Sequence, residues 1–200
     1  MTAPAIAFEY RSADGARSVK CSWGGTCRIA PDSREFASAL LSALLDFDAE
    51  PGARIIVLDS DPRALDETAR DTLRARIGFI PADSGLISHL NGWENCVLPL
   101  GFHHPAKLPG IAPRVLQTLS ALGCTAETLL AKLPEDMSMI ERKSISFARA
   151  LTLDPELLVM ENFSIGLDPG ARGRVGEFAA AYHAAFPGGT FMQFDHHDSV

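Results

Sequence analysis

Long apolar runs and a targeting segment are both missing from this sequence. No apolar stretch of the chain approaches the length of about 20 residues that a membrane-spanning helix needs. The first ten residues, MTAPAIAFEY, lack the basic start and the apolar core of a signal peptide. The composition, 46% apolar and 22% charged over 200 residues, suits one packed domain without disorder. We therefore expect a single cytoplasmic domain that reaches a membrane only through a partner.

Basic clusters and metal-binding patterns are also scarce. The formal net charge is −7, and no lysine- and arginine-rich cluster is interleaved with aromatic residues, so nucleic acid is not an expected partner. Two histidine pairs lack nearby carboxylates and project apart, so neither predicts a metal site: His103-His104 and His196-His197. None of the 4 cysteines has C-x-x-C spacing, and we expect all of them to be reduced and mostly buried: Cys21, Cys27, Cys96 and Cys124.

Apolar strands alternate with helical segments along the chain. Antiparallel strands are predicted at 5–10, 18–21 and 25–29, and further strands at 54–59, 77–80, 157–160 and 190–194. Helices are predicted at 35–45, 66–75, 138–151 and 170–186, with segments at 93–102, 112–122 and 126–132 that Pro99, Pro105 and Pro109 interrupt. This alternation predicts an α/β fold with a mostly parallel sheet flanked by helices, in one domain whose core is 1–84 and 138–200 and whose helical subdomain is 85–137.

The second half of the chain carries a specific order of short motifs. Arg149-Ala150-Leu151 is followed by Asp154-Pro155, by the apolar run 157–160 and by Gly166-Leu167-Asp168-Pro169. Each piece alone is weak, but in this order they resemble the signature helix, Walker B strand and D-loop of an ABC-transporter ATPase. The resemblance implies a P-loop NTPase-like ABC ATPase fold with an antiparallel N-terminal β part and a helical subdomain.

The resemblance extends over nearly the whole chain. The segments 77–87 and 94–100 look like the Q-loop and the start of the helical subdomain. The segment 190–197 is similar to the last core strand, which ends in the switch histidine, here His196. Phe8-Glu9-Tyr10 resembles the strand that carries the adenine-stacking aromatic, which makes Tyr10 a candidate nucleotide-binding residue.

The phosphate-binding loop is where the resemblance fails. A P-loop needs glycines, whose backbone N–H groups turn around the phosphates, and a lysine that reaches the phosphate oxygens. The equivalent segment, 29–38, contains neither residue type. Depending on the register, Phe36 or Ala37 occupies the lysine position, and either one removes the charge.

Two interpretations of this segment remain. In the first, Asp32 or Ser33 caps a helix with Glu35 in its first turn, and the carboxylates at that end oppose phosphate binding. In the second, Arg34 binds phosphate bidentately in place of the lysine, with Ser38 as a second candidate ligand.

The residues that would carry out hydrolysis are altered as well. The family's metal-holding Asp and catalytic Glu fall on Glu161 and Asn162, and an asparagine cannot accept a proton at neutral pH. The Q-loop glutamine falls on Ala82, or on Asp83 if the loop shifts by one residue. His196 is retained, although a histidine at a strand end is more often simply hydrogen-bonded to its neighbours.

The signature motif is degenerate too. The resemblance implies that this motif serves the nucleotide of a partner subunit in an ABC dimer. Ser138 keeps a hydroxyl group, but Met139 and Ile140 replace the glycines that allow close approach of the backbone to phosphate. Both half-sites of the chain are therefore impaired.

A partner surface is predicted between the Q-loop and the helical subdomain, where ABC ATPases bind the coupling helix of their permease. Ile87, Leu90, Trp93 and Val97 recur at helical spacing and would line this surface. In the alternative, these side chains only pack the subdomain core. The segment 85–100, GLISHLNGWENCVLPL, looks closest to lipid-import ATPases of the Mce-associated type.

The leading hypothesis is a catalytically inactive ABC ATPase-like subunit without ATP or magnesium, peripheral to the inner membrane through a permease, or paired with a second ATPase subunit or another copy. The first alternative is a working ATPase that uses Arg34 and Glu161. A second alternative is a regulator that binds nucleotide on Tyr10 without turnover.

Overall fold

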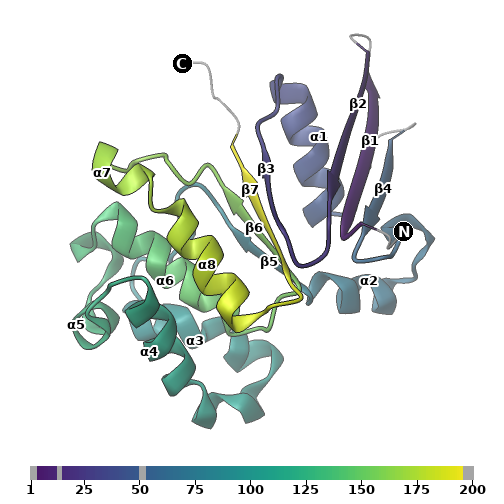
Figure 1. The fold of residues 1–200 in the computed structure, drawn as a ribbon. Helices are drawn as coiled ribbons and strands as arrows, with labels where there is room; N and C mark the ends of the chain where they lie inside the picture. The colour runs from purple at the N-terminus through teal and green to yellow at the C-terminus, as the bar shows by residue number, and fades with distance from the viewer. Residues whose placement is uncertain (1–3, 13–14, 50–52, 196–200) are drawn as a thin grey trace.

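A small antiparallel sheet forms the N-terminal part of the molecule (Figure 1). The structure is a computed structural model that describes residues 4–12, 15–49 and 53–195. Strand β1 (Ile6–Ser12) pairs with β2 (Gly15–Cys21) on one side and with β4 (Arg54–Val57) on the other. Ile6 and Phe8 are buried while the intervening Ala7 is partly exposed, which is the alternation of a sheet with one covered face.

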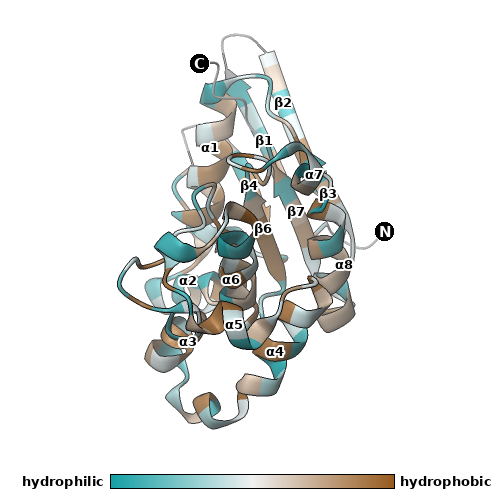
Figure 2. Cartoon of the chain, turned by 90° about the vertical axis from the view of Figure 1, so that its left-hand side faces the viewer, coloured by the Kyte–Doolittle hydropathy of each residue, from teal (hydrophilic) through white to brown (hydrophobic). Residues whose placement is uncertain are grey.

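Four parallel strands form the central sheet, in the order β3 (Thr26–Ile29), β7 (Thr190–Phe194), β6 (Leu157–Glu161) and β5 (Ile77–Ile80). The middle strands β6 and β7 are buried almost throughout, because helices cover both faces. The apolar β6 is brown in Figure 2. The prediction that 25–29 pairs antiparallel is wrong, because β3 leaves the turn after β2 and pairs in parallel with β7 instead.

Helices pack on both faces of the parallel sheet and build the helical subdomain. They are α1 (Arg34–Leu45), α2 (Glu67–Arg74), α3 (Gly92–His103), α4 (Ala112–Ala121), α5 (Ala126–Ala131), α6 (Met139–Leu151), α7 (Pro169–Arg172) and α8 (Val175–Ala185). Short 3-10 turns lie at Pro62–Ala64, Pro105–Gly110 and Pro134–Asp136. None of the helices in the described residues combines the length and the apolarity needed to cross a bilayer.

The pleat of the parallel sheet divides the core into two layers. Val159 of β6 belongs to the cluster that contains Leu40 of α1 and the inner face of the antiparallel sheet. The neighbouring Leu158 belongs to the cluster on the other face, with Phe147 of α6 and Phe178 of α8. Successive residues of a strand point to opposite faces, so one short apolar run supplies both layers.

The helical subdomain has a third apolar cluster. Its buried members come mostly from α3, α4 and α5, but Ile145 and Ala148 of α6 also belong to it. The predicted interruption at Pro99 is wrong, since α3 runs continuously through this proline. Packing of Cys96 and Leu100 against the cluster offsets the backbone hydrogen bond that Pro99 cannot donate. The helix α6 therefore connects the core with the subdomain.

The predicted helix at 170–186 is also corrected by the structure. It consists of two helices, α7 and α8, with Gly173 at the end of the first. Glycine has a low helix propensity, and the Arg174 N–H bonds to the Ala171 carbonyl in a tighter turn that ends α7.

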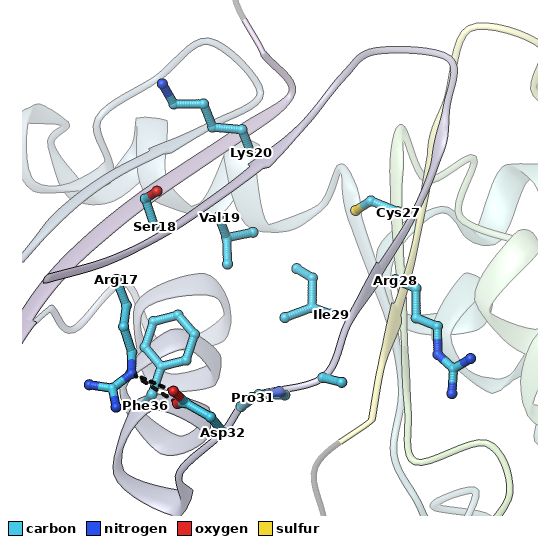
Figure 3. Close-up of a pocket in the computed structure, with 11 residues that line it drawn as sticks. Arg17, Ser18, Val19, Lys20, Cys27, Arg28, Ile29, Pro31, Asp32 and Phe36 are labelled. Carbon is cyan, nitrogen blue, oxygen red and sulfur yellow. Dashed lines mark hydrogen bonds and ion pairs between the residues drawn. The ribbon is translucent and has the colours of Figure 1, made fainter.

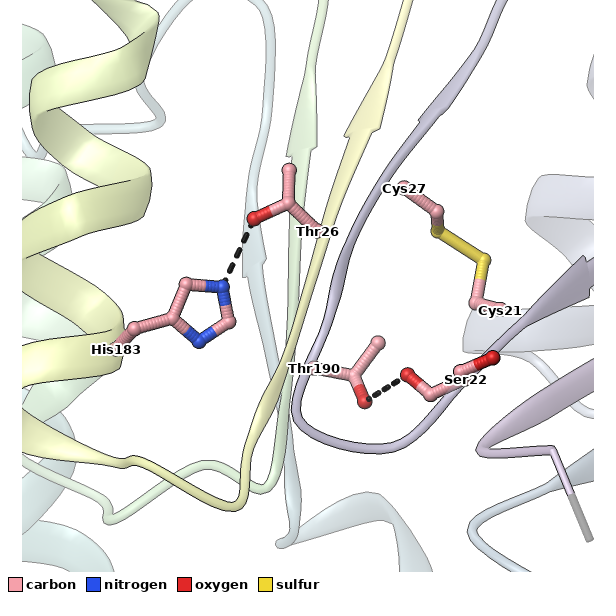
Figure 4. Close-up of a disulfide and its surroundings, with 6 residues drawn as sticks. All are labelled: Cys21, Ser22, Thr26, Cys27, His183 and Thr190. Atoms are coloured by element: carbon pink, nitrogen blue, oxygen red, sulfur yellow. Dashed lines mark hydrogen bonds between the residues drawn. A yellow bond between two sulfur atoms is a disulfide. The ribbon is translucent and has the colours of Figure 1, made fainter. Parts of the chain in front are cut away.

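Cys21 and Cys27 form a disulfide, contrary to the prediction that all cysteines are reduced (Figure 4). The turn between β2 and β3 brings their Cα atoms to 5.8 Å, a proximity that the spacing in the sequence does not reveal. Cys96 and Cys124 are free thiols, buried and partly buried respectively, as predicted.

Candidate functional site

The segment that replaces the phosphate-binding loop begins an ordinary capped helix. Ser33 is the N-cap of α1, and its hydroxyl accepts a hydrogen bond from the Phe36 N–H at 3.2 Å. Glu35 lies in the first turn. The helix-capping part of the first interpretation is thus confirmed, with Ser33 rather than Asp32 as the cap, and one of the N–H groups at this helix end already has a partner. That the carboxylates oppose phosphate binding stays a prediction.

Both residues that can occupy the lysine position point into the core. Phe36 and Ala37 are buried, and the Phe36 ring lies 5.9 Å from the Phe8 ring and 6.0 Å from the Tyr10 ring. Tyr10 is only 3% exposed, and its hydroxyl donates a 2.6 Å hydrogen bond to Glu35. This burial does not fit the predicted adenine-stacking role, because an adenine needs an accessible ring face.

The polar candidates beside this segment are exposed. Arg34 and Ser38 lie on the outer face of α1. Asp32 lies just before the helix N-terminus, and its carboxylate accepts a hydrogen bond from the Arg17 guanidinium at 2.9 Å (Figure 3). The residues present offer no glycine backbone and no lysine, so they do not reproduce the donor set of a triphosphate cradle.

The Q-loop position and the end of β6 come together. Glu161 accepts a hydrogen bond from the Ala82 N–H at 3.2 Å. On the other side of the same residue, the Lys143 ammonium donates to the Ala82 carbonyl at 2.8 Å. Two charged side chains, one from β6 and one from α6, therefore hold both backbone groups of Ala82.

Lys143 was not singled out from the sequence. It is 1% exposed, and burial lowers the pKa of its ammonium, although Asp83 and Glu161 oppose the shift. Its spacing in the sequence indicates this burial, because Lys143 lies four residues before Phe147 on the apolar side of α6.

Arg149 holds the next part of the same loop. Its guanidinium donates to the Gly85 carbonyl at 2.7 Å and to the Ser84 carbonyl at 3.1 Å. Ser84 is fully buried with φ of 74°, a left-handed conformation that a non-glycine residue adopts only when its surroundings enforce it. The arginine of the signature helix thus has a structural partner.

Asn162 is 4% exposed and follows β6 with φ of 42°. Asparagine tolerates this left-handed region better than most residues. Its N–H donates to the Phe194 carbonyl at 2.7 Å, and its carbonyl accepts from Ile165 at 3.0 Å. His196, the third predicted equivalent of a catalytic residue, lies outside the described residues.

Ser138 caps α6 in a reciprocal arrangement with Glu141. The Ser138 hydroxyl donates to the Glu141 carboxylate at 2.9 Å, and that carboxylate also accepts Lys132 at 2.7 Å. Met139 lies against Gly166, so that a Cβ on this glycine would come within 2.9 Å of the Met139 methyl group. Side chains therefore fill the space that glycines would leave open.

The predicted partner-surface residues divide between two roles. Trp93 and Val97 are half-buried against the third core cluster, and the Ile87 backbone bonds to the Asn95 side chain. Leu90 and Val97 line a mainly apolar groove of about 350 Å³ on α3, together with Glu94, Leu98, Gly101, Phe102 and Leu108.

Phe102 is a large apolar side chain of this groove that is 78% exposed, and sequence reasoning missed it. The signal was present, because Phe102 lies one helical turn beyond Leu98 in α3. Among the described residues no cluster of three or more histidine, cysteine, aspartate or glutamate side chains is arranged to hold a metal ion.

Comparison with solved structures identifies this arrangement. The protein cbiO1 from Clostridium perfringens, part of the ABC transporter complex cbiONQ, matches with a TM-score of 0.78 over 98% of this chain and 80% of its own, at 17% identity. The chain has the fold of an ABC-transporter ATP-binding domain. This ABC ATPase fold also matches a dimeric, post-hydrolysis structure of the ATP-binding cassette MJ0796 with ADP and Pi, at a TM-score of 0.67, 19% identity and 98% and 87% coverage.

Curated sequences agree with this ABC-type fold, although no family model matches the chain. The methionine import ATP-binding protein MetN of Cupriavidus necator is 31% identical over 132 residues, which is 66% of this chain and 38% of that protein. The MetN protein of Clostridioides difficile is 26% identical over the same share of this chain and 40% of its own length. The match thus spans about two fifths of the length of these relatives.

Proposed function

We propose that this protein is a catalytically inactive ABC ATP-binding-subunit-like protein that acts by associating with a permease. The observation that carries the proposal is the burial of Phe36, and of Ala37 beside it, where an active subunit needs its lysine. A lysine ammonium at either position would have to leave water and displace core packing. The position is thus occupied by a structural residue.

The end of β6 supports the same proposal. Glu161, the remaining carboxylate, already accepts the Ala82 N–H, and its neighbour Asn162 has no basic atom to take a proton from water. Loss of a positioned general base costs about two to four powers of ten in rate. We infer that binding and turnover of ATP are both absent.

Calorimetry with magnesium and ATP tests the inactive state. We expect no binding heat at millimolar nucleotide for the wild-type protein. Binding that disappears in Tyr10→Ala would favour the nucleotide-regulator alternative, and binding that disappears in Arg34→Ala, with ATP hydrolysis, would favour the working ATPase. Ser42→Ala, in the same helix but away from its N-terminus, is the control for general damage to α1.

The groove on α3 is the part of the molecule that we assign to the permease. It is mainly apolar, it is lined by Leu90, Val97 and Phe102, and one carboxylate, Glu94, stands at its side. An amphipathic helix binds such a groove with its apolar face. The matched cbiO1 protein is part of a transporter complex, which favours the same kind of partner here. Membership of the Mce-associated branch stays a prediction.

Co-expression with a permease encoded next to this gene tests the association. We expect the complex to survive affinity purification and to be lost in Phe102→Asp. Leu116→Asp on α4 is the matched control, because Leu116 is also an exposed apolar residue, at 38% exposure, and lies outside the groove. Equal recovery of the complex with both variants would contradict the assignment.

A further inference from the structure

A second groove lies between two strands whose outer edges pair with no strand among the described residues. β2 is the outer strand of the antiparallel sheet, and β3 is the outer strand of the parallel sheet. The two strands diverge from the Cys21–Cys27 disulfide, so that one sheet does not continue into the other (Figure 1). The space between them is a groove of about 450 Å³ (Figure 3).

The strand pairings determine which backbone groups of β2 face this groove. The Leu58 N–H bonds to the Ala5 carbonyl, so the backbone groups of Ala5 point toward β4. Backbone groups of successive residues in a strand alternate in direction, so those of Phe8, three residues later, point toward β2. Its partner Val19 consequently turns its own N–H and carbonyl toward β1. The backbone groups of Ser18 and Lys20 point to the free edge.

The free edge of β3 follows from the same alternation. The Ile29 carbonyl accepts the Asp195 N–H at the end of β7, at 2.8 Å, and the Gly25 carbonyl accepts the Phe191 N–H at 3.0 Å. Residues between them alternate, so the backbone groups of Thr26 and Arg28 point away from β7. Two rows of hydrogen-bonding groups, one on each strand, thus flank the groove.

The floor of the groove is apolar. Val19 of β2 and Ile29 of β3 point toward each other across it, and Phe36 of α1 lies beside them (Figure 3). An extended chain that lies in the groove presents alternate side chains to this floor and the intervening ones to solvent. The groove therefore suits a strand with apolar residues on one face.

The rim of the groove is positively charged in a chain whose net charge is −7. Arg17, Lys20 and Arg28 line it, and Asp32 is the one carboxylate among the lining residues. Asp32 pairs with Arg17 at 2.9 Å, and Arg28 pairs with Asp195 outside the lining at 3.2 Å. Both rim arginines donate hydrogen bonds to carboxylates of this chain, which shows the chemistry that the rim binds, and Lys20 adds a further exposed ammonium.

We propose that the groove binds an extended, acidic segment of a partner protein as an added strand between β2 and β3. Backbone hydrogen bonds to Ser18, Lys20, Thr26 and Arg28 would supply affinity, and carboxylates at the rim would supply selectivity. This surface goes beyond the proposed function, because it lies at the end of the molecule away from α3 (Figure 1).

A peptide of alternating valine and glutamate tests this proposal against the same peptide with lysine in place of glutamate. Each is titrated into isotope-labelled protein, and amide exchange is followed by NMR. We expect slower exchange at the amides of Ser18, Lys20, Thr26 and Arg28 with the glutamate peptide, and about tenfold weaker binding of the lysine peptide at low salt.

A matched pair of variants separates strand addition from simple charge attraction. Ser18→Pro removes the outward N–H without removing a bond of the β1–β2 ladder, whereas Ser18→Ala keeps this N–H. We expect about tenfold weaker binding by Ser18→Pro than by Ser18→Ala. If Ser18→Pro does not fold, Arg28→Pro compared with Arg28→Ala on the other strand takes the place of this pair, again with an expected loss.

Several results would overturn the proposal. They are no binding at millimolar glutamate peptide, equal binding of both peptides, equal affinity of the two Ser18 variants, or protection elsewhere in the chain. Self-association that Ser18→Pro abolishes would assign the groove to a second copy of this chain and would equally reject an acidic partner. Size-exclusion chromatography of the free protein measures that outcome.

Discussion

At the scale of single residues, charged side chains of α6 hold the loop 81–85 that follows β5. Lys143 and Arg149 both donate to backbone carbonyls of that loop, at Ala82 and at Ser84 and Gly85. Neither side chain is free for a ligand, and both lose solvation when they are buried. Lys143 and Arg149 lie on the helix that resembles the signature helix, and their hydrogen-bond partners are backbone carbonyls of the same chain.

Lys143→Met tests the cost of this buried charge. Burial lowers the pKa of Lys143 below its ordinary value of 10.5, so the unfolded chain binds this proton more tightly than the folded protein. The free energy of unfolding of the wild type should therefore rise relative to the variant as the pH increases toward that value. Urea unfolding at several pH values measures the difference. A difference that falls with pH contradicts the burial.

Cys96 should be chemically inert in the folded protein. Burial raises the pKa of its thiol to about 12, with Arg149 opposing the shift. Iodoacetamide at pH 8 should label the half-buried Cys124 at least about a hundredfold faster than Cys96, because only the thiolate reacts. Mass spectrometry of timed samples gives both rates. Similar rates for Cys96 and Cys124 in the folded protein would reject this burial. In the control, unfolding by urea should make the two alkylation rates equal.

Sequence reasoning at this scale succeeded where the chemistry is local. The capped start of α1 followed from Ser33 and Glu35, which interact within one helical turn. It missed Lys143, because a lysine is expected at the surface and its actual acceptor, Ala82, lies 61 residues earlier in the chain. It also assigned Tyr10 to a ligand, whereas the fold brings this ring against Phe36.

At the scale of elements, α3 serves both the core and a surface. One side contributes Cys96 and Leu100 to the subdomain core, and another lines the apolar groove with Val97 and Phe102. The first turn of α3 lies very close to α5, because a Cβ on Gly92 would come within 2.8 Å of the Leu129 carbonyl oxygen. Glycine is thus required where the two helices meet.

Two glycines of this helix should respond in opposite ways. Gly92→Ala should lower the free energy of unfolding by about 1–3 kcal/mol, because backbone atoms of α5 cannot move aside cheaply. Gly101→Ala should raise it by up to about 1 kcal/mol, since alanine is the better helix former and a Cβ there meets only a Leu108 methyl at 4.0 Å. Urea denaturation compares the variants. Equal effects of the two substitutions would contradict the packing of α3 on α5.

The bounds of most elements could be predicted within a residue or two, because apolar spacing and capping residues mark them. The strands at Ile77–Ile80 and Thr190–Phe194 agree with the structure at both ends. The predicted break at Pro99 was wrong because the packing of α3 outweighs one lost hydrogen bond. The predicted single helix at 170–186 was wrong because one weak helix former, Gly173, divides a long helical pattern.

At the scale of the whole molecule, two sheets are joined at one turn. The Cys21–Cys27 disulfide connects the last residue of β2 to β3, and the Thr190 hydroxyl donates to the Ser22 carbonyl at 3.1 Å within the same junction (Figure 4). The α1 layer packs on both sheets. Stability of the antiparallel part is therefore coupled to that of the parallel part.

Removal of this disulfide should destabilise the whole fold. Cys21→Ser opens a loop with a sequence separation of 6, and the chain-entropy estimate for so short a loop is about 2 kcal/mol. A single unfolding transition should move to lower urea, and a reducing agent should give the same shift in the wild type. Cys124→Ser is the control and should have little effect. A wild-type protein with four alkylatable thiols would show that the bond does not form.

The sequence by itself determined the order of elements, the α/β class, a capped helix start at Asp32 or Ser33 and the absence of a lysine from the segment 29–38, because each depends on residues that are neighbours along the chain. Only the tertiary structure decided that β3 joins the parallel sheet, that Cys21 meets Cys27, that Lys143 is buried and that two free strand edges flank one groove. These features depend on which distant segments pack together, and local spacing carries no information about that choice.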